Sequence, residues 1–444
     1  MSTLRTGPLL IRGGTLLPMD DGPTSVRGDV LVQGRQIAAV GRVAAPDGAR
    51  ILDASGCYVM PGLVQVHVHL VQTIFRGLAE DLSLLDWLRA RVWPLEAGHD
   101  DDSIRASVRL GISELLLTGT TTILDMGTTH GGDVVFEELV RSGIRARAGQ
   151  AMMDTGEGVP ARLLERTRSS LDAAAALIKR WHGHDSGRIQ YAYAPRFALT
   201  STRNMLEAVG TLAKIGSHIV HTHSNENVAE GALVERATGS APIAYLEQTG
   251  IASERAVIAH AVHLSEDEMR ILRASGAKVA HCPSSNLKLA SGVADLVGLR
   301  GAGITVGIGA DGAACNNRLD AFEELRLAAL LARTRHGPSA ISAADVLRMG
   351  TAGGAHALRA ESEIGTLAVD KRADIVILDS GALSPGGDVA TRIVFGGGSR
   401  AVRDVLVDGQ VLVRDRALTR MDAESVRFAA AEALPGLISR ADLH

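Results

Sequence analysis

Short, almost continuously apolar runs alternate with amphipathic stretches between about residue 61 and residue 365. Such runs are typical of strands covered on both faces, and apolar positions at helical spacing predict helices between them. Eight runs predict strands, at 63–69, 120–126, 146–153, 188–195, 217–224, 256–263, 278–285 and 305–312. The predicted helices include 102–117, 163–181, 202–214, 266–274 and 318–331. We therefore predict an α/β fold, a (β/α)8 TIM barrel; a doubly wound open sheet is the alternative, because periodicity does not show closure.

The two ends of the chain carry a different pattern. A β-branched run at 29–33 is followed by Gly34 and a second apolar run, and the same order recurs around Gly409 at 404–411. Each of these segments predicts a β-hairpin. Their likeness predicts that both ends pair in one small β domain beside the barrel, with two unrelated surface hairpins as the alternative. From about Ala423 onward, the pattern predicts an amphipathic helix.

Composition narrows the class of protein. With 444 residues and 46% apolar content, the chain is long enough for one large barrel and a smaller unit. Its net charge of −4, mixed in sign, gives no basic surface for nucleic acid. Residues 1–12 lack the apolar core of a signal peptide, and no apolar run reaches the roughly 18 residues of a membrane span. We expect a cytoplasmic protein without a disulfide framework, since its three cysteines are widely separated.

Histidine or aspartate stands near the end of four predicted strands. His67 and His69 are two residues apart, so on a strand their side chains share a face. His223 lies at the end of the fifth predicted strand, His260 on the sixth and Asp311 on the eighth. In a barrel, these strand ends meet at one face, where catalytic groups lie. Core packing explains the pattern poorly, because a buried aspartate without a partner is costly.

Together, His67, His69, His223 and Asp311 predict an N3O metal site that leaves a position for water. The set suits one Zn²⁺ per chain, with Fe²⁺ or Mn²⁺ as alternatives. Such a metal would lower the pKa of its water to about 7 and so supply hydroxide. His221 shares the strand face of His223 and is the alternative ligand.

A series of motifs runs almost from end to end of the chain: Pro61-Gly62-Leu63 before His67-Val68-His69, then His223-Ser224-Asn225-Glu226, His260, the stretch 281–289 and Gly309-Ala310-Asp311-Gly312. This combination resembles the amidohydrolase superfamily, in particular its branch of purine deaminases and triazine chlorohydrolases. The resemblance implies a barrel over 61–365 and a composite β-sandwich domain built from 1–60 and 366–444.

The resemblance also implies roles for the site residues. His67, His69, His223 and Asp311 would be the metal ligands, and metal-bound hydroxide would attack a ring carbon. Glu226 would shuttle a proton to the adjacent ring nitrogen, since an acid that is not a ligand can cycle its proton. His260 would hydrogen-bond the hydroxide and the developing alkoxide, and Asp311 would help pass a proton to the leaving ammonia. The implied activity is hydrolytic deamination of an amino-substituted N-heterocycle.

The motifs favour two different substrates. Trp87 and Glu96 resemble positions that adenosine-type deaminases use for the base and the ribose hydroxyls. Gln72 and Arg196 instead resemble guanine deaminases, and they stand where the adenosine-type enzymes have Met and His. Arginine offers only donors, which favours a carbonyl, and glutamine matches a lactam edge. We expect guanine or a related oxo-aminopurine or pterin as the substrate, with Phe197 stacking on the base.

Other interpretations stay open. Arg196 alternatively forms a salt bridge across the barrel mouth, Gln72 caps a helix, and Glu96 lies on the surface after Pro94. For the activity, the alternatives are deamination of S-adenosylhomocysteine or methylthioadenosine, hydrolysis of a triazine, and a non-catalytic scaffold, against which the complete ligand set argues. We also expect a homo-oligomer, a dimer or larger, that binds a small heterocycle and neither nucleic acid nor a membrane.

Overall fold

The computed structural model describes residues 7–20, 22, 24–383 and 385–443, and its centre is a closed barrel of parallel strands. Its strands are β6 (Leu63–His69), β7 (Thr120–Thr128), β8 (Arg145–Met152), β9 (Ile189–Pro195), β10 (Ile219–Ser224), β11 (Ala256–His260), β12 (Lys278–His281) and β13 (Val306–Ile308). Strand β13 pairs with β6, and the short β14 (Asp311–Gly312) pairs with the end of β6 beyond it. The first and last strands therefore meet, which confirms the predicted barrel and makes the open sheet wrong.

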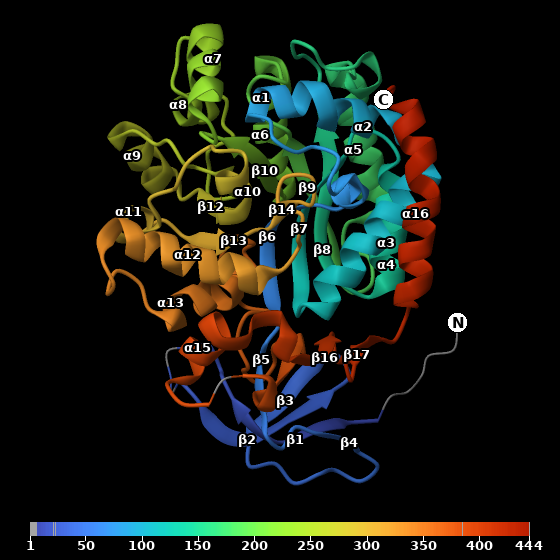
Figure 1. Cartoon of the computed structure of the whole chain (residues 1–444), viewed down its shortest axis with the longest axis vertical. Helices are drawn as coiled ribbons and strands as arrows, with labels where there is room; N and C mark the ends of the chain where they lie inside the picture. Colours follow the sequence, from blue (N-terminus) through green and yellow to red (C-terminus); the bar gives the residue numbers. More distant parts are fainter. Residues whose placement is uncertain (1–6, 21, 23, 384, 444) are drawn as a thin grey trace.

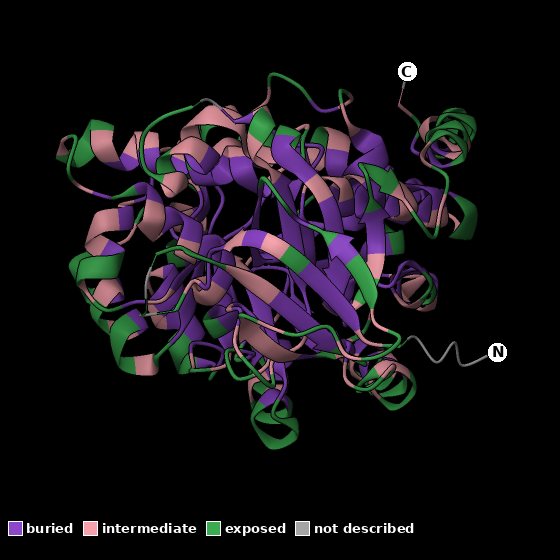
Figure 2. Cartoon of the chain, turned by 90° about the horizontal axis from the view of Figure 1, so that it is seen from below, coloured by how far each residue is buried: buried purple, intermediate pink, exposed green. Residues whose placement is uncertain are grey.

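Helices surround the barrel (Figure 1), and from below the buried strands lie inside helices with exposed outer faces (Figure 2). The five predicted helices correspond to α3 (Asp101–Leu117), α5 (Thr167–Trp181), α6 (Arg203–Gly216), α9 (Glu266–Ser275) and α12 (Ala321–His336). Others in the ring are α4 (Gly132–Ser142), α7 (Val228–Thr238), α8 (Pro242–Gln248), α11 (Leu296–Gly301) and α13 (Ala343–Arg348). Between β6 and α3, the segment of η1 (Leu70–Phe75), α1 (Leu84–Trp87), η2 (Leu88–Val92) and α2 (Trp93–Gly98) lies over the carboxyl ends of the strands.

Two barrel strands end earlier than the apolar pattern predicts. Strand β11 stops at His260 because His260 and Ala261 both adopt left-handed backbone, with φ of 76° and 48°. Strand β12 stops at His281, since Pro283, which has no N–H to give to a sheet, begins the short helix α10 (Pro283–Lys288). Both breaks lie at the carboxyl ends of strands, where the chain turns over the barrel mouth.

Both ends of the chain contribute to a second sheet below the barrel (Figure 1). Its strands are β1 (Leu9–Leu16), β2 (Val26–Gln33), β3 (Gln36–Gly41), β4 (Arg50–Asp53), β5 (Cys57–Pro61), β15 (Ile375–Asp379), β16 (Val402–Val407), β17 (Gln410–Arg414) and β18 (Ala417–Leu418). The predicted hairpins are β2–β3 and β16–β17, both antiparallel. Antiparallel pairing of β5 with β15 joins the two halves into one sheet, so the two hairpins are not unrelated.

The C-terminal helix α16 (Ala423–Arg440) returns from this sheet to the side of the barrel and lies along α2 and α3 (Figure 1). Gly98 allows the close approach, because a Cβ there would lie 3.1 Å from the carbonyl oxygen of Leu437. Arg440 Nε donates to the Gly98 carbonyl at 2.7 Å. We propose domain boundaries at 60/61 and 365/366, with α16 as a return of the sheet domain onto the barrel.

Parts of two predictions fall outside the described residues. Residues 1–6 belong to the stretch without a signal-peptide core, and residues 1–6, 21, 23, 384 and 444 belong to the predicted sheet domain. Within the ranges that are described, no helix is both long enough and apolar enough to cross a bilayer.

A buried ion-pair network joins the barrel to the sheet domain. Arg145, at the start of β8, pairs with Asp374 at 2.7 Å and with Asp408, and all three residues are buried. The backbone N–H of Asp408 also donates to Asp374 at 2.8 Å. Asp408 has a second partner in Arg35 at 3.1 Å, whereas Asp374, among the described residues, pairs with Arg145 alone, so the removal of this guanidinium would leave Asp374 buried without a counter-charge.

Replacing Arg145 with Met is expected to lower the free energy of unfolding by about 3–5 kcal/mol, because Asp374 would stay buried without a cation and Asp408 would keep Arg35 at 3.1 Å. Urea unfolding followed by circular dichroism measures the change. Arg168→Met is the matched control, since the Arg168–Asp172 pair lies at the surface with side chains 87% and 64% exposed. A loss no larger than that of the control would contradict the prediction.

Candidate metal centre and active site

Three histidines and one aspartate converge at the carboxyl ends of β6 and β10 and at the start of β14. One ligand atom from each of His67, His69, His223 and Asp311 lies within 4.8 Å of the others. His67 Nε2 is 3.1 Å and His69 Nε2 3.3 Å from Asp311 Oδ1, and His69 Nε2 is 3.2 Å from His223 Nε2. Ligands held about 2.1 Å from one zinc ion lie roughly 3–4 Å apart, so the four residues fit a metal.

The protonation of the histidines agrees with a ligand set. Burial lowers the pKa of His69 and of His223 well below the ordinary value, so both imidazoles are neutral. His223 Nδ1 lies 2.6 Å from the carbonyl oxygen of Arg196, to which it donates its proton. Its Nε2 therefore carries the lone pair and faces the cluster, as a metal ligand requires.

The structure separates the two histidines of β10 that the strand pattern left as alternatives. His223 belongs to the cluster, whereas His221 lies behind it, with Nε2 2.6 Å from Nδ1 of His67. His221 thus orients His67. Asp311 is oriented in a similar way, since Oδ2 accepts from the Ser285 hydroxyl at 2.7 Å. Sequence reasoning missed both contacts, because nothing in the sequence shows which side chain lies behind a ligand.

The backbone is left-handed where three site residues leave their strands. The φ angles are 55° for Asn225, 76° for His260 and 64° for Asp311. Such conformations cost energy for residues with a Cβ, and they cluster at functional sites where the surrounding structure enforces them. These turns lie at the barrel mouth, and the side chains of His260 and Asp311 face the cluster, whereas that of Asn225 donates to Glu268.

Glu226 and His260 lie beside the cluster, as the sequence predicts. His260 Nδ1 is 2.9 Å from Asn286 Oδ1, and its Nε2 is 3.4 Å from Glu226 Oε2 and 3.9 Å from Asp311 Oδ2. Glu226 Oε1 is buried and has no hydrogen-bond partner among the described residues. Burial raises the pKa of Glu226 well above its ordinary value, and the charge of Asp311 raises it further. The protonated form of this acid is thus favoured beside the cluster.

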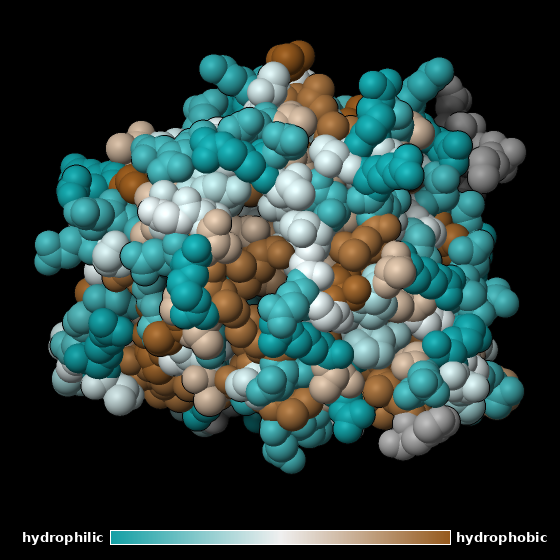
Figure 3. Space-filling view, turned by 90° about the horizontal axis from the view of Figure 1, so that it is seen from above, coloured by the Kyte–Doolittle hydropathy of each residue, from teal (hydrophilic) through white to brown (hydrophobic). Residues whose placement is uncertain are grey.

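The pocket over the cluster has an apolar wall. Its apolar residues are Leu84, Trp87 and Leu88, from the segment over the mouth, and Phe197, after β9. The polar residues that line it beside His69, His223 and Asp311 are Gln72, Arg196, Glu226, Glu230 and His260. Seen from above, apolar side chains gather around a hollow on this face (Figure 3). An apolar ring system would be shielded here from water, beside the polar groups that would act on it.

Gln72, Glu96 and Arg196 form one buried network at this pocket. Arg196 Nη1 pairs with Glu96 Oε2 at 2.5 Å, and Gln72 Nε2 donates to Glu96 Oε1 at 2.9 Å. The alternative of a salt bridge for Arg196 is therefore the one observed, and Glu96 is buried rather than at the surface. Gln72 packs against Gly312, where a Cβ would lie 2.1 Å from Gln72 Oε1.

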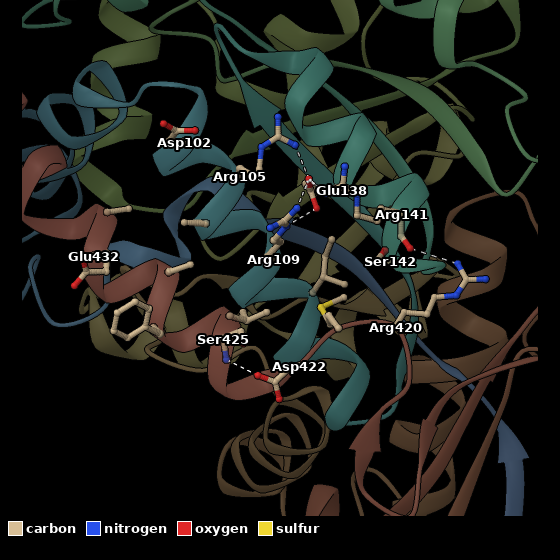
Figure 4. Close-up of a pocket in the computed structure, with 17 residues that line it drawn as sticks. Asp102, Arg105, Arg109, Glu138, Arg141, Ser142, Arg420, Asp422, Ser425 and Glu432 are labelled. Atoms are coloured by element: carbon tan, nitrogen blue, oxygen red, sulfur yellow. Dashed lines mark hydrogen bonds and ion pairs between the residues drawn. The ribbon is translucent and has the colours of Figure 1, made fainter. Parts of the chain in front are cut away.

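A groove of about 680 Å³ lies far from this site, between α3, α4 and α16 (Figure 4). Its wall holds Glu138, which accepts from Arg105 at 2.6 Å and from Arg109 at 2.7 Å and lies 3.5 Å from Arg141. The charges thus compensate one another within the wall. Over the described residues, the only set of ligands that could hold a metal is the one at the barrel mouth.

Three imidazoles and a carboxylate meet at the strand ends of a closed barrel, with an acid beside them. This arrangement defines a metal-dependent hydrolase. The chain belongs to the amidohydrolase family, whose model matches residues 58–412.

The curated relatives support this assignment over nearly the full length. A 5-methylthioadenosine/S-adenosylhomocysteine deaminase from Halobacterium salinarum is 37% identical and covers 98% of this chain and 99% of its own. A 5'-deoxyadenosine deaminase from Methanothermobacter thermautotrophicus is 35% identical and covers 96% of each chain.

Solved structures resemble the barrel and the second sheet together. An adenosine deaminase from Xanthomonas campestris with bound zinc has a TM-score of 0.90 at 31% identity, covering 97% of this chain and 98% of its own. Guanine deaminase from E. coli has a TM-score of 0.82 at 27% identity, covering 92% and 98%. An atrazine chlorohydrolase from Arthrobacter aurescens complexed with zinc has a TM-score of 0.88 at 28% identity, covering 96% and 100%. The family match and the deaminase relatives together show that the chain is a hydrolytic deaminase, an enzyme that acts on C–N bonds.

Proposed function

We propose that the enzyme deaminates an adenosine-type nucleoside that lacks the 5' hydroxyl, such as methylthioadenosine, 5'-deoxyadenosine or S-adenosylhomocysteine. The observation that carries this proposal is the buried Glu96, which is held by Gln72 and Arg196, two residues that line the pocket. A carboxylate fixed in this way still has lone pairs for ribose hydroxyls. The names of the relatives favour the same class of substrate.

The same network weakens the prediction of guanine. That prediction needs the donors of Gln72 and Arg196, but Gln72 Nε2 and Arg196 Nη1 are both bound to Glu96. Gln72 Oε1 and Trp87 Nε1 are buried without partners among the described residues. A nucleoside offers hydroxyl donors and ring-nitrogen acceptors for such groups, whereas a guanine carbonyl would have to accept from Arg196 donors other than the one held by Glu96.

In the proposed mechanism, His67, His69, His223 and Asp311 hold the metal, for which we propose Zn²⁺, with Fe²⁺ as the alternative. When bound, the metal supplies a water molecule acidified enough to act as the nucleophile at neutral pH. Zinc suits a set of three imidazoles and one carboxylate, and the neutral state of His69 and His223 fits it.

The acid and base roles fall to residues that face the pocket. Glu226 donates a proton to the ring nitrogen next to the carbon under attack, because its Oε1 is buried and free of other partners. His260, whose Nδ1 donates to Asn286 Oδ1, presents its Nε2 to the cluster and hydrogen-bonds the nucleophile there. Asp311 accepts a proton from the nucleophile and helps to pass it to the departing amino group, so that neutral ammonia leaves.

A substrate screen tests the proposal directly. Purified enzyme should release ammonia from methylthioadenosine, 5'-deoxyadenosine or S-adenosylhomocysteine, with the absorbance shift from an adenosine-like to an inosine-like spectrum. Guanine, a pterin and a chlorotriazine are the comparison substrates. Turnover of guanine at a higher kcat/KM than any nucleoside would overturn the proposed substrate class.

Replacing Glu96 with Gln is expected to lower kcat/KM for methylthioadenosine by about 10–100-fold, because hydrogen bonds to a charged group are worth about 1.5–3 kcal/mol. The same change should matter little for 2',3'-dideoxyadenosine, which lacks the 2' and 3' hydroxyls that Glu96 would bind. Steady-state kinetics on both compounds give the ratio. An equal loss on both would show that Glu96 acts through Arg196 and Gln72 and does not contact the ribose.

Guanine or another oxo-amino heterocycle is the second candidate. It is favoured by Arg196, which lines the pocket and offers donors in addition to the one bound to Glu96. A carbonyl at the pocket wall could accept from these donors, and Phe197 lies on the same wall. Release of xanthine from guanine in the screen is the result that would select it.

A further inference from the structure

The turn that carries Glu226 is held tightly by its neighbours. It lies between β10 and α7 and begins at Asn225, whose φ of 55° is left-handed. Asn225 Nδ2 donates to Glu268 Oε1 and to the carbonyl oxygen of His263, each at 2.9 Å. A polar residue in a strained conformation is thus fixed on two sides, and the backbone of Glu226 follows it directly.

The side chain of Glu226 has little to hold it in place. Among the described residues, its Oε1 has no hydrogen-bond partner, and its Oε2 lies 3.4 Å from His260 Nε2. The direction of this side chain therefore depends on the backbone from which it starts. Any group that holds that backbone bears on where the proposed acid points.

Glu230 is such a group, and the proposed mechanism gives it no role. It lies in the first turn of α7, it is buried, and its Oε2 accepts from the backbone N–H of Glu226 at 3.2 Å. It also lines the pocket over the cluster. Burial raises the pKa of Glu230 to about 7, although backbone N–H groups, that of Glu226 first among them, lower it.

We infer that Glu230 is a positioning residue, whose carboxyl group holds the backbone of Glu226 and thereby keeps the Glu226 side chain over the metal cluster. The inference rests on the proposed function, because it assigns Glu230 an effect only through Glu226. It concerns the accepting oxygen of Glu230 rather than its charge, since the contact is to an N–H group.

Helix capping accounts for only part of these contacts. Asn227 is the N-cap of α7 and accepts from the backbone N–H of Ala229 at 2.9 Å. In a capping box, a Glu three residues after the cap returns to the N–H of the cap residue itself, and the carboxyl group of Glu230 does interact with the Asn227 N–H. Glu230 Oε2 also reaches one residue further, to the Glu226 N–H, and does so as a buried carboxyl group, which a surface cap has no need to be.

Two substitutions separate the accepting oxygen from the rest of the side chain. Glu230→Leu keeps most of the volume and removes the acceptor, and it is expected to lower kcat by about 100-fold, the effect of a misplacement of about 1 Å. Its KM for methylthioadenosine should stay near the wild-type value. Glu230→Gln keeps an accepting oxygen and should restore kcat to near that of the wild type.

The matched control is Glu235→Leu, an exposed position on the same helix. Metal content and thermal midpoint are measured for every variant, and both should equal those of the wild type. If Glu230→Leu does not fold, Glu230→Asp replaces it, because a carboxyl group one methylene shorter keeps the charge but does not reach the Glu226 N–H. It should show the same selective fall in kcat.

A double variant gives the decisive result. If Glu230 acts through Glu226, adding Glu230→Leu to Glu226→Gln should lower kcat no further. A further fall of the same size in the double variant would overturn the inference. So would wild-type kcat in Glu230→Leu, a KM that rises as much as kcat falls, or a Gln variant as slow as the Leu variant.

Failure of the proposed function can be told apart from failure of this inference. If the wild type deaminates none of the nucleosides, the proposed substrate is wrong, and the same variants are then measured on whichever heterocycle in the screen releases ammonia. If Glu226→Gln keeps full kcat on that substrate, the role of Glu226 is wrong and the inference falls with it. If Glu226→Gln is slow and Glu230→Leu is not, the inference alone fails.

Discussion

Glu226→Gln is expected to lower kcat by about 10²–10⁴-fold, the usual contribution of a general acid–base residue. Glutamine keeps the size of the side chain and an oxygen that can accept, but it has no proton to exchange. Burial and the charges of Asp311 and Glu230 hold the pKa of Glu226 well above its ordinary value, so the wild-type residue can carry that proton. The KM for the nucleoside should change little, because the loss falls on the reaction step. Steady-state and single-turnover measurements of ammonia release give both parameters.

The control for this variant is Glu235→Gln, which makes the same chemical change at an exposed position of α7. It should keep wild-type kcat and KM. Metal content measured by mass spectrometry should be equal in both variants, since Glu226 is not one of the four clustered ligands. A Glu226→Gln enzyme with wild-type kcat would show that the proton comes from another group.

Asp311→Asn is expected to have an effect at least as large, for a different reason. It replaces the one carboxylate among the clustered ligands by a neutral amide, which binds a metal ion more weakly. We expect the bound metal to fall well below one ion per chain and kcat/KM to fall by about 10³-fold or more, beyond the roughly 10–100-fold typical of residues that only orient a ligand. Metal analysis, with activity measured before and after addition of Zn²⁺, checks both expectations.

Ser285→Ala provides the matched comparison for this second variant. It removes the hydroxyl that donates to Asp311 Oδ2 at 2.7 Å and leaves the carboxylate in place. Its loss of kcat/KM should stay within about 10–100-fold and be relieved in part by added metal. If Asp311→Asn bound metal as well as Ser285→Ala does, Asp311 would not be a ligand.

Local patterns were sufficient to predict the elements of the fold. The eight barrel strands lie where continuous apolar runs predict them, because strands buried on both faces need apolar residues at every position. The hairpins of the second sheet follow from glycines between β-branched runs. The early end of β11 was missed, because the left-handed turn at His260 is imposed by packing at the barrel mouth rather than by a local propensity. The early end of β12 was missed although Pro283 is a local signal for it.

The sequence was sufficient to predict the clustered ligands of the candidate site, but not how the side chains of the pocket wall pair with one another. The strand period of two places His67 and His69 on one face, and the parallel strands bring His223 and Asp311 to the same end. The pairing of Arg196 with Glu96 joins residues 100 positions apart, and no spacing rule shows which partner a charged residue will choose. For this reason Arg196 and Glu96 favoured different substrates when each was interpreted alone. As one network they favour a nucleoside.

The pairing of β5 with β15 has a consequence for the order in which the chain can fold. The contact between Pro61 and Ile375 closes a loop that contains the whole barrel. Closing so long a loop has a large entropic cost, and folds rich in such distant contacts form slowly. During synthesis, the first strands of the second sheet must wait with an unpaired edge until the barrel has been translated. Exposed edges of this kind promote aggregation. We therefore expect the yield of folded enzyme during expression to depend more on the supply of chaperones than on the stability of the folded protein.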